Sequence, residues 1–419
     1  MQRTVKIIFM ITFLFEIGLS QSALFLLITP SIERAGMAET GVASPSNDPA
    51  ALQMNPATGT FYSQSGARVS HIQSHSSWLP GLVNDMYIDV KATLLQINTY
   101  NNQATRFFSL KTIMFGQYST YLDAGKQRHT GPNGEDFGTF TTYFKADNSV
   151  LGFGFGHQIL GREIETGVGV TFKRIIQHLT DGGSDTVGEA TNTAADFGFI
   201  ARTKFLLPLK NRSKGEIINI TPALGYAQLN IGDEVVFNDA EQADPLPRTA
   251  RFGISIDINL MDDRDIELLS FRGERSATDN LIDHKIGSLK YQSGLGDINP
   301  INHVLLQEES DKVTIHNGFE MGFGEIIWLR AGNYHDSSGK IHYESVGLEV
   351  SFTGFIPWLS TDGLDYSLLG PINRYLGVHY LYSEYHVGAY HPLHGTRFQG
   401  IKLELKHLDE LLSMISPKH

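Results

Sequence analysis

The chain has 419 residues, of which 33 are lysine or arginine and 45 are aspartate or glutamate, and it contains no cysteine. The formal net charge of −12 argues against a nucleic acid partner, and the lack of cysteine excludes disulfides, thiolate metal sites and cysteine catalysis. Charged residues make up only 19% of the chain, whereas there are 42 glycines, 25 phenylalanines and 16 tyrosines. This composition suits a transmembrane barrel, in which polar lumen-facing residues dilute the apolar lipid-facing ones.

Residues 1–22 have the pattern of a secretory signal peptide. Arg3 and Lys6 provide a basic start, residues 7–19 are mostly apolar, and small residues follow from Ser20 to Ala23. We place cleavage between Ser20 and Ala23. No later stretch reaches the roughly 18 apolar residues of a spanning helix, so the sequence predicts none.

Residues 23–80 contain too many turn-forming residues for a strand. These residues are Gly36, Gly41, Asn47, Asp48, Pro49, Asn55 and Pro56. We predict that this segment is a plug inside a barrel formed by residues 81–407, because a wide barrel would otherwise stay open. A periplasmic extension is the alternative. Residues 408–419 are predicted to be a polar tail with helical character.

The barrel strands are predicted from apolar residues that alternate with small or polar ones. The clearest stretch runs from Arg251 to Leu260, where a period of two places the two sets on opposite faces of a strand. We expect Phe252 to Leu260 to face lipid, and Arg251 and Asp257 to face the lumen. Similar alternation recurs at 151–156, 167–172, 197–202, 346–352 and 401–406. The charged residues of the lumen-facing set, which we expect to contact water, are Arg202, Glu349, Lys402, Glu404 and Lys406.

Short and long connections alternate in this region. Gly161, Arg162 and Glu163 form a short connection, whereas longer polar insertions lie at residues 126–137, 178–193, 232–248, 273–303 and 382–395. Outer-membrane barrels have short periplasmic turns and longer external loops. The sequence therefore predicts an all-β fold, an antiparallel transmembrane β-barrel of the outer membrane.

Three blocks resemble the N-terminal region of the FadL-like outer-membrane proteins: Phe25–Pro30, Arg34–Ala43 and Asn55–Ala57. Within that group they look most like the PorV (LptO) proteins of the type IX secretion system, and Trp78–Met86 is similar to the PorV segment after the plug. Residues 246–249, 329–332 and 363–366 also fit that family. The residues that carry the resemblance are Gly36, Met37, Gly41, Asn55, Pro56 and Ala57 in the plug, then Trp78, Leu79, Asn84 and Asp85.

The sequence also departs from the family pattern. Ala38 stands where the family usually has a second glycine, and Gln53 and Met54 precede Asn55 where an aromatic residue is common. The tail after His407 replaces the aromatic residue on which such barrels commonly finish. These departures indicate a divergent paralogue of the proteins that the chain resembles.

The resemblance implies a barrel of fourteen strands that receives cargo with a type IX C-terminal signal domain from the translocon and passes it to a sortase-like partner. The protein would not be an enzyme and would need no cofactor or metal. It would bind cargo through loops 126–137, 178–193 and 232–248 in the outer membrane of a Bacteroidetes-like, Gram-negative bacterium.

Two other classes of function are considered. The alternative is a FadL-like channel for hydrophobic small molecules, which requires an apolar pocket above the plug and a lateral gap in the wall. A continuous wall around a polar, tightly plugged lumen would rule that channel out. An outer-membrane hydrolase is the third class, although the sequence has no Gly-x-Ser-x-Gly elbow.

Two motifs have two interpretations each. Pro56 restricts Asn55 to extended geometry, so Asn55, Pro56 and Ala57 form a rigid turn, which either gates the lumen or only holds the plug in place. Trp78 is either part of a patch for a partner or an aromatic anchor at the membrane interface, and the second is favoured.

The remaining clusters favour ordinary surface roles. His379, His386, His391 and His394 lie close in sequence, but their spacing matches no metal motif. The acidic residues 181–185 and 262–265 are predicted to be solvated turns. Gly152, Gly154 and Gly156 lie within an alternating strand, which excludes a nucleotide loop.

Overall fold

The computed structural model describes residues 22–62, 66–81, 86–99, 108–130, 136–159, 162–179, 188–208, 217–237, 243–262, 267–285, 288–292, 294–356 and 372–415. Several sequence predictions fall outside the described residues. These are the signal peptide up to residue 21, Asn84 and Asp85, Gly161, the acidic residues 181–185 and 263–265, and residues 363–366.

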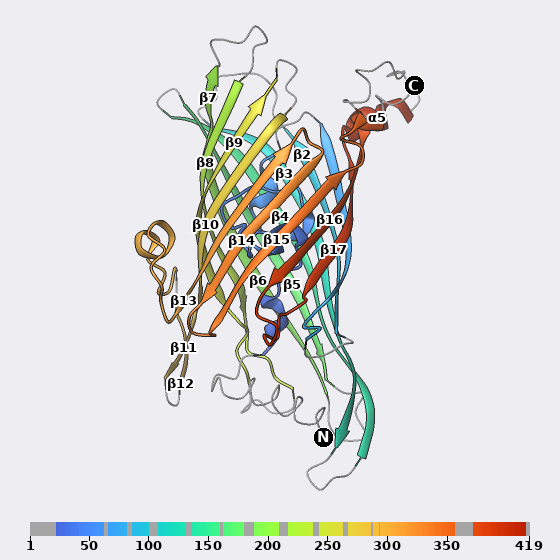
Figure 1. Cartoon of the computed structure of the whole chain (residues 1–419), viewed down its shortest axis with the longest axis vertical. Helices are drawn as coiled ribbons and strands as arrows, with labels where there is room; N and C mark the ends of the chain where they lie inside the picture. The colour runs from blue at the N-terminus through green and yellow to red at the C-terminus, as the bar shows by residue number, and fades with distance from the viewer. Residues whose placement is uncertain are drawn as a thin grey trace.

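The described strands form a closed antiparallel barrel of fourteen strands, as Figure 1 shows. Neighbouring strands follow one another in sequence, and pairing of β1 with β17 and of β6 with β8 completes the ring. The short strand β7 pairs with β8 just beyond the end of β6, so it continues β6 after Lys204. The strands are β1 (Ala67–Ser77), β2 (Tyr87–Asn98), β3 (Phe108–Thr130), β4 (Asp136–Ile159), β5 (Arg162–His178), β6 (Glu189–Thr203), β7 (Phe205–Pro208), β8 (Ile217–Gly232), β9 (Thr249–Met261), β10 (Glu267–Asn280), β13 (Val313–Phe323), β14 (Ile327–Asp336), β15 (Ile341–Ser351), β16 (Leu376–His386) and β17 (Arg397–Leu405).

The outer surface of the barrel has an apolar band and, on one side, a polar region next to it. Large apolar side chains point outward and stay exposed, such as Phe172 at 65% and Ile401 at 55%. A row of registered partners across β2 to β6 consists of Ile97, Ile113, Phe153, Val168 and Phe199. Nearer the long loops, the corresponding row across β1 to β5 consists of Gln73, Lys91, Ser119, Asp147 and Arg174. The apolar band therefore faces lipid, and these strands continue past it into water.

The alternating stretch from Arg251 to Leu260 forms strand β9, and its outward and inward residues are on the predicted sides. Phe252 and Ile254, however, pack against the apolar cluster of Leu281, Ile298 and Val304 on the outer face. Ile256 is 40% exposed on the outer face, whereas Arg251 and Asp257 are buried on the lumen side. The alternation thus separates lipid from lumen.

The long insertions gather at one end of the barrel, the lower end in Figure 1. The loop 232–248 lies between β8 and β9 as predicted, but several strands run further into the predicted loops. β3 and β4 stay paired as far as Thr130 and Asp136, and β10 continues to Asn280. A small hairpin, β11 (Ile282–Lys285) with β12 (Ser288–Tyr291), and a π-helix, η5 (Pro300–Leu305), follow β10. The polar residues in these segments do not end the strands, because beyond the apolar band both faces of a strand can contact water.

The barrel begins earlier than residue 81. Strand β1 starts at Ala67, inside the segment that the sequence assigned to the plug. Its outward side chains include His71, Gln73 and His75, so it lacks the apolar alternation that marks the other strands. The remaining helices are η1 (Leu24–Leu27), α2 (Ile32–Ala35), η2 (Pro49–Gln53), η3 (Thr58–Thr60) and α5 (Leu408–Ile415). None of the helices in the described ranges is both long and apolar enough to cross a membrane.

Candidate functional site

The lumen is filled by residues 22–62, which we call the plug (Figure 1). At the long-loop end, Ser22 N donates to Pro245 O at 3.1 Å. At the opposite end the chain enters β1 through Gly66, whose carbonyl accepts from Asn98 N at 2.9 Å. Almost all described plug residues are buried, so the plug closes the barrel along its length.

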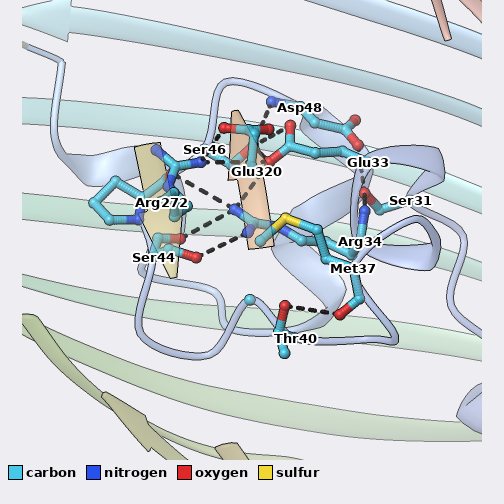
Figure 2. A network of polar contacts seen from close by, with 12 residues as sticks. Ser31, Glu33, Arg34, Met37, Thr40, Ser44, Ser46, Asp48, Arg272 and Glu320 are labelled. Carbon is cyan, nitrogen blue, oxygen red and sulfur yellow. Dashed lines mark hydrogen bonds and ion pairs between the residues drawn. The ribbon is translucent and has the colours of Figure 1, made fainter. Parts of the chain in front are cut away.

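Figure 2 shows the polar network around Arg34, whose side chain is 0% exposed. The guanidinium lies 3.1 Å from the Glu33 carboxylate and donates to Ser44 Oγ at 2.8 Å. Ser44 in turn donates to Glu274 of β10, which also accepts from Gly41 N at 2.8 Å. Arg34 thus shapes the 41–44 turn, and the Glu274 carboxylate attaches that turn to the wall.

The wall next to the plug carries a chain of ion pairs across neighbouring strands. Arg330 lies between two carboxylates, with its Nε 2.7 Å from Glu320 and its Nη2 2.6 Å from Glu349. Lys402 Nζ lies 2.8 Å from the other oxygen of Glu349. Arg272 pairs with Asp257 at 2.7 Å and lies 3.8 Å from Glu33 of the plug. These charges compensate each other in a dry environment, where an unpaired one would be very costly.

This network corrects one sequence prediction. Glu349, Lys402 and Glu404 were expected to contact water, but their side chains are 4%, 6% and 5% exposed. The plug excludes water from this part of the lumen, so the charges are satisfied by each other. Arg202 instead pairs with Glu165 at 2.6 Å near the end of the barrel that lies opposite the long loops.

Asn55 joins the plug to the wall. Its Nδ2 donates to Val42 O at 2.7 Å within the plug, and to Phe199 O of β6 at 3.1 Å and Tyr226 O of β8 at 3.2 Å. Its Oδ1 accepts from Ala57 N at 2.9 Å, which closes the turn around Pro56. The same side chain therefore forms a tight turn and attaches that turn to the wall where β6 meets β8.

The plug is seated against glycines that face the lumen. A Cβ on Gly198 would overlap Asn55 Oδ1 and lie 2.8 Å from Pro56 Cδ, and a Cβ on Gly253 would lie 2.6 Å from Val42 Cγ1. Other wall glycines against the plug are Gly152, Gly154, Gly167, Gly169, Gly225, Gly318, Gly332, Gly347 and Gly400. Because a side chain would collide with the plug, these positions form a continuous groove for it.

Each plug residue singled out from the sequence has its own structural role. A Cβ on Gly36 would lie 2.9 Å from Gly347 Cα of β15, so the two backbones touch. Gly41 has a φ of 136° and packs against the Arg34 side chain. Met37 is fully buried against the wall. Ala38, the departure from the family glycine, has a φ of 51°, the left-handed region that favours glycine.

An apolar chamber occupies the long-loop end of the lumen. Phe25 and Leu26 of η1 are 5% and 6% exposed, and the Phe25 ring lies 5.6 Å from that of Phe144, with the two stacked. The chamber wall is contributed by inward-facing apolar residues of β2 to β6 and the 232–248 loop, including Ile88, Val90, Leu122, Ala146, Ile175, Ala190 and Leu246. Only about 10 Å³ stays empty beside Phe25 and Leu26, so the plug fills the chamber. The residual space is also bounded by polar residues: Gln53, Tyr118, Thr120, Asn148 and Lys173.

Two larger cavities lie at the two ends of the barrel, and only the first is lined by plug residues. One of about 150 Å³ lies at the end opposite the long loops and is lined by Phe61, Tyr62, Phe155, Lys111 and Arg202, among others. Arg202 stacks over the Phe61 ring at 4.5 Å. Another cavity of about 360 Å³ lies at the rim of the long-loop end, where β15, β16 and the 387–396 loop meet.

The remaining sequence candidates are Trp78, Leu79 and the histidines between residues 379 and 394. Trp78 packs against Phe398, whose side chain faces the lumen, with 6.2 Å between ring centroids, and Leu79 joins the same apolar cluster. The histidines do not converge: His379 lies in the lumen 3.0 Å from Glu349, whereas His391 and His394 lie in the loop after β16. Among the described residues, no group of three His, Asp or Glu side chains could hold a metal.

The sequence patterns missed the charged residues that connect the plug to the wall, Glu33, Arg34, Arg272 and Glu274. The wall residues could have been found from the sequence, because they are charged residues on the lumen-facing side of alternating strands. Their partners lie too far away in the sequence for spacing to reveal them.

No family model matches the chain, and neither does any curated protein. Among solved structures, the chain is similar to the toluene transporter TodX of Pseudomonas putida, with a TM-score of 0.36 and 10% identity over 90% of this chain and 98% of that one. A FadL homologue of Pseudomonas aeruginosa matches with a TM-score of 0.36 and 11% identity over 91% and 99%. The transport unit of the autotransporter AIDA-I from Escherichia coli matches with a TM-score of 0.38 and 10% identity over 81% and 88%. At such values, the function has to be argued from this chain's own residues.

Proposed function

We propose that the protein is a barrel of the outer membrane of a Gram-negative bacterium that admits small hydrophobic molecules into its lumen, with the plug as the gate. The observation that carries this proposal is the apolar chamber at the long-loop end, which η1 fills with Phe25 and Leu26. Apolar walls with few polar groups are the usual lining of a site for a hydrophobic ligand.

In this proposal η1 occupies the place of the ligand. Burying one large apolar side chain contributes roughly 1.5–3 kcal/mol. A hydrophobic molecule of similar size gains about as much, so exchange of η1 for the ligand is nearly balanced. The segment lies near the predicted cleavage site, where it could leave the chamber without any movement of the strands.

The proposed route runs along the lumen. Every neighbouring pair of described strands around the ring is hydrogen-bonded, so the lateral gap expected of a FadL-like channel is not found in the described part of the wall, and the lumen is tightly plugged. The polar half of the criterion is not met around η1, where many wall residues are apolar, so the proposal requires a route that opens only when the plug shifts. A ligand in the chamber would next meet the turn at Asn55 and Pro56. The cavity at the other end, which Phe61 and Tyr62 line together with the charged Lys111, Glu165 and Arg202, would receive it once the plug shifts.

The test compares two neighbouring plug residues. Phe25 is 5% exposed in the chamber, whereas Leu24 is 43% exposed. The Phe25→Ala variant should bind radiolabelled decanoate several-fold more tightly than the native protein in detergent, because its chamber is partly vacated. The Leu24→Ala variant should bind like the native protein. Equal binding by all three proteins, with the barrel intact by gel mobility before and after heating, would contradict the proposal.

Delivery of secreted cargo in type IX secretion is a second candidate, supported by one observation. The hairpin of β3 and β4, teal in Figure 1, extends beyond the other strands at the long-loop end, and its registered pairs continue to Thr130 and Asp136. Such a projection offers an edge and a surface to a protein partner. A tagged chain should then recover proteins with C-terminal signal domains in mild detergent, and a version shortened by residues 126–141 should not. Recovery of none by the full chain would exclude this role.

A further inference from the structure

The insertion between β12 and β13 contains η5 (Pro300–Leu305), which packs on the outer face of the barrel wall. The sequence predicted a polar insertion over residues 273–303, whereas Val304 of η5 is buried in an apolar cluster with Ala250 of β9 and Ala277 of β10. Phe252 and Ile254 of β9 are partly buried against the same cluster. This segment therefore covers outward side chains that would otherwise contact lipid.

Polar contacts fix η5 to the wall. Arg275 of β10 donates from Nη1 to Leu305 O at 3.0 Å, and Asn317 of β13 donates from Nδ2 to Gln307 Oε1 at 2.6 Å. At the other end, the Asn299 side chain accepts from two backbone amides in the first turn of η5. Both ends of the helix are thus held, and one side of it is pressed against the wall.

The side of η5 that points away from the wall is apolar. Ile301, Leu305 and Leu306 are 60%, 51% and 62% exposed. Leu306 N donates to Ile301 O at 2.9 Å, and a turn closed by such a bond places its first residue beside the fourth and fifth residues that follow. The three side chains therefore share one exposed side, whereas Val304 points into the wall cluster.

The registered rows of the wall give the depth of this apolar side. Ile256, Gly273 and Phe319 are partners across β9, β10 and β13, and Ile256 and Phe319 are 40% and 47% exposed in the lipid-facing band. Arg275, which holds the carboxyl end of η5, lies two residues beyond Gly273 toward the long loops, or about 7 Å along the strand. The exposed side of η5 therefore adjoins the lipid-facing band.

The course of the chain agrees with this depth. In Figure 1, η5 is the coil at the left of the barrel, and it lies above the β11–β12 hairpin, nearer to the middle of the wall. The chain thus turns back from the long-loop end along the outside of the barrel. Glu308 and Glu309, which follow Leu306 closely, are exposed and charged, so the apolar surface ends at that point.

We propose that η5 is a lipid-contacting part of the barrel, in which Ile301, Leu305 and Leu306 contact acyl chains of the leaflet on the long-loop side. The occupant is lipid because this apolar side continues the band of Ile256 and Phe319. On its inner side η5 takes the place of lipid against the wall, and on its outer side it offers lipid a new apolar surface. This inference goes beyond the proposed function and does not depend on what enters the lumen.

The experiment uses the absence of native cysteine, which allows single nitroxide labels without other changes. Labels are attached to the Ile301→Cys and Leu305→Cys variants of the full chain in phosphatidylethanolamine–phosphatidylglycerol vesicles. Phe319→Cys gives the lipid reference on β13, and Glu308→Cys is the matched control at an exposed charged residue beside η5. Collision with oxygen, which concentrates in lipid, is compared with collision with a water-soluble nickel chelate.

The oxygen-to-nickel collision ratio at Ile301→Cys and Leu305→Cys should be several-fold above that at Glu308→Cys and should approach that at Phe319→Cys. A ratio equal to that of Glu308→Cys would overturn the proposal, because η5 would then lie in water. Low collision with both reagents would also overturn it, since a protein surface would then cover this side. Decanoate binding by Phe25→Ala tests the proposed function separately, so failure of one does not imply failure of the other.

Discussion

The side-chain amide of Asn55 lies 3.1 Å from Phe199 O and 3.2 Å from Tyr226 O, which belong to the paired neighbouring strands β6 and β8. One plug residue therefore contacts both sides of a junction in the wall. The turn uses Oδ1 and the wall attachment uses Nδ2, so a substitution can remove the wall attachment and keep the turn.

Asn55→Asp should therefore release the plug from the wall while the turn is kept. The aspartate retains an acceptor for Ala57 N but loses the donor to Phe199 O and Tyr226 O. Loss of bonds to buried carbonyl groups should lower the free energy of unfolding by about 1–3 kcal/mol, and hydrogen exchange of the plug amides should rise. Asn55→Ala should behave similarly. If Asn55→Asp exchanged as slowly as the native protein, the turn alone would hold the plug.

Gly198→Ala should displace the plug near Asn55. The added methyl group would overlap Asn55 Oδ1, and overpacking of this kind typically costs about 1–3 kcal/mol. The matched control is Gly273→Ala on the outer face, where a Cβ would have no contact closer than 3.6 Å. Thermal unfolding followed by circular dichroism and single-channel recording in planar bilayers check this. Only Gly198→Ala should unfold at a lower temperature and show brief openings; similar behaviour of the two variants would refute the groove.

Arg330→Met should destabilise the barrel more than any surface arginine. Its loss leaves Glu320 and Glu349 buried without their shared cation, and breaking a buried pair in this way costs about 3–5 kcal/mol. Arg397→Met is the control, since Arg397 is 60% exposed and its pair with Glu384 is worth about 1 kcal/mol or less. Urea titration of the barrel in micelles measures both. Equal midpoints would show that Lys402 and Arg272 alone balance these carboxylates.

Phe153→Arg should disturb membrane insertion, whereas Asp147→Arg on the same face of β4 should not. Phe153 belongs to the apolar row, where an arginine costs about 2–4 kcal/mol at mid-depth of the bilayer. Asp147 belongs to the polar row beyond it; its side chain is 42% exposed and lies 2.7 Å from Lys145. The yield of folded barrel in vesicles, read from heat-dependent gel mobility, should fall only for Phe153→Arg. Equal yields would place the bilayer elsewhere on the strand.

The sequence could predict the strands because lipid and lumen demand opposite side chains at alternate positions. That demand fixed the faces of β9, where Ile256 points outward and Arg251 inward. It failed at β1, whose outward His71 and Gln73 do not mark a lipid-facing strand. It also could not place the partners of Arg34, because Glu274 becomes its neighbour through Ser44 only after the barrel closes around the plug.

The glycine groove has a consequence for how the barrel is made. The groove glycines extend from β4 to β17, and a Cβ on Gly400 of β17 would lie 2.8 Å from Ile32 Cδ1 of the plug. A plug that contacts the wall this closely would not be able to enter a barrel that has already closed. We therefore expect the plug to be in place before β17 pairs with β1, so that the wall closes around it.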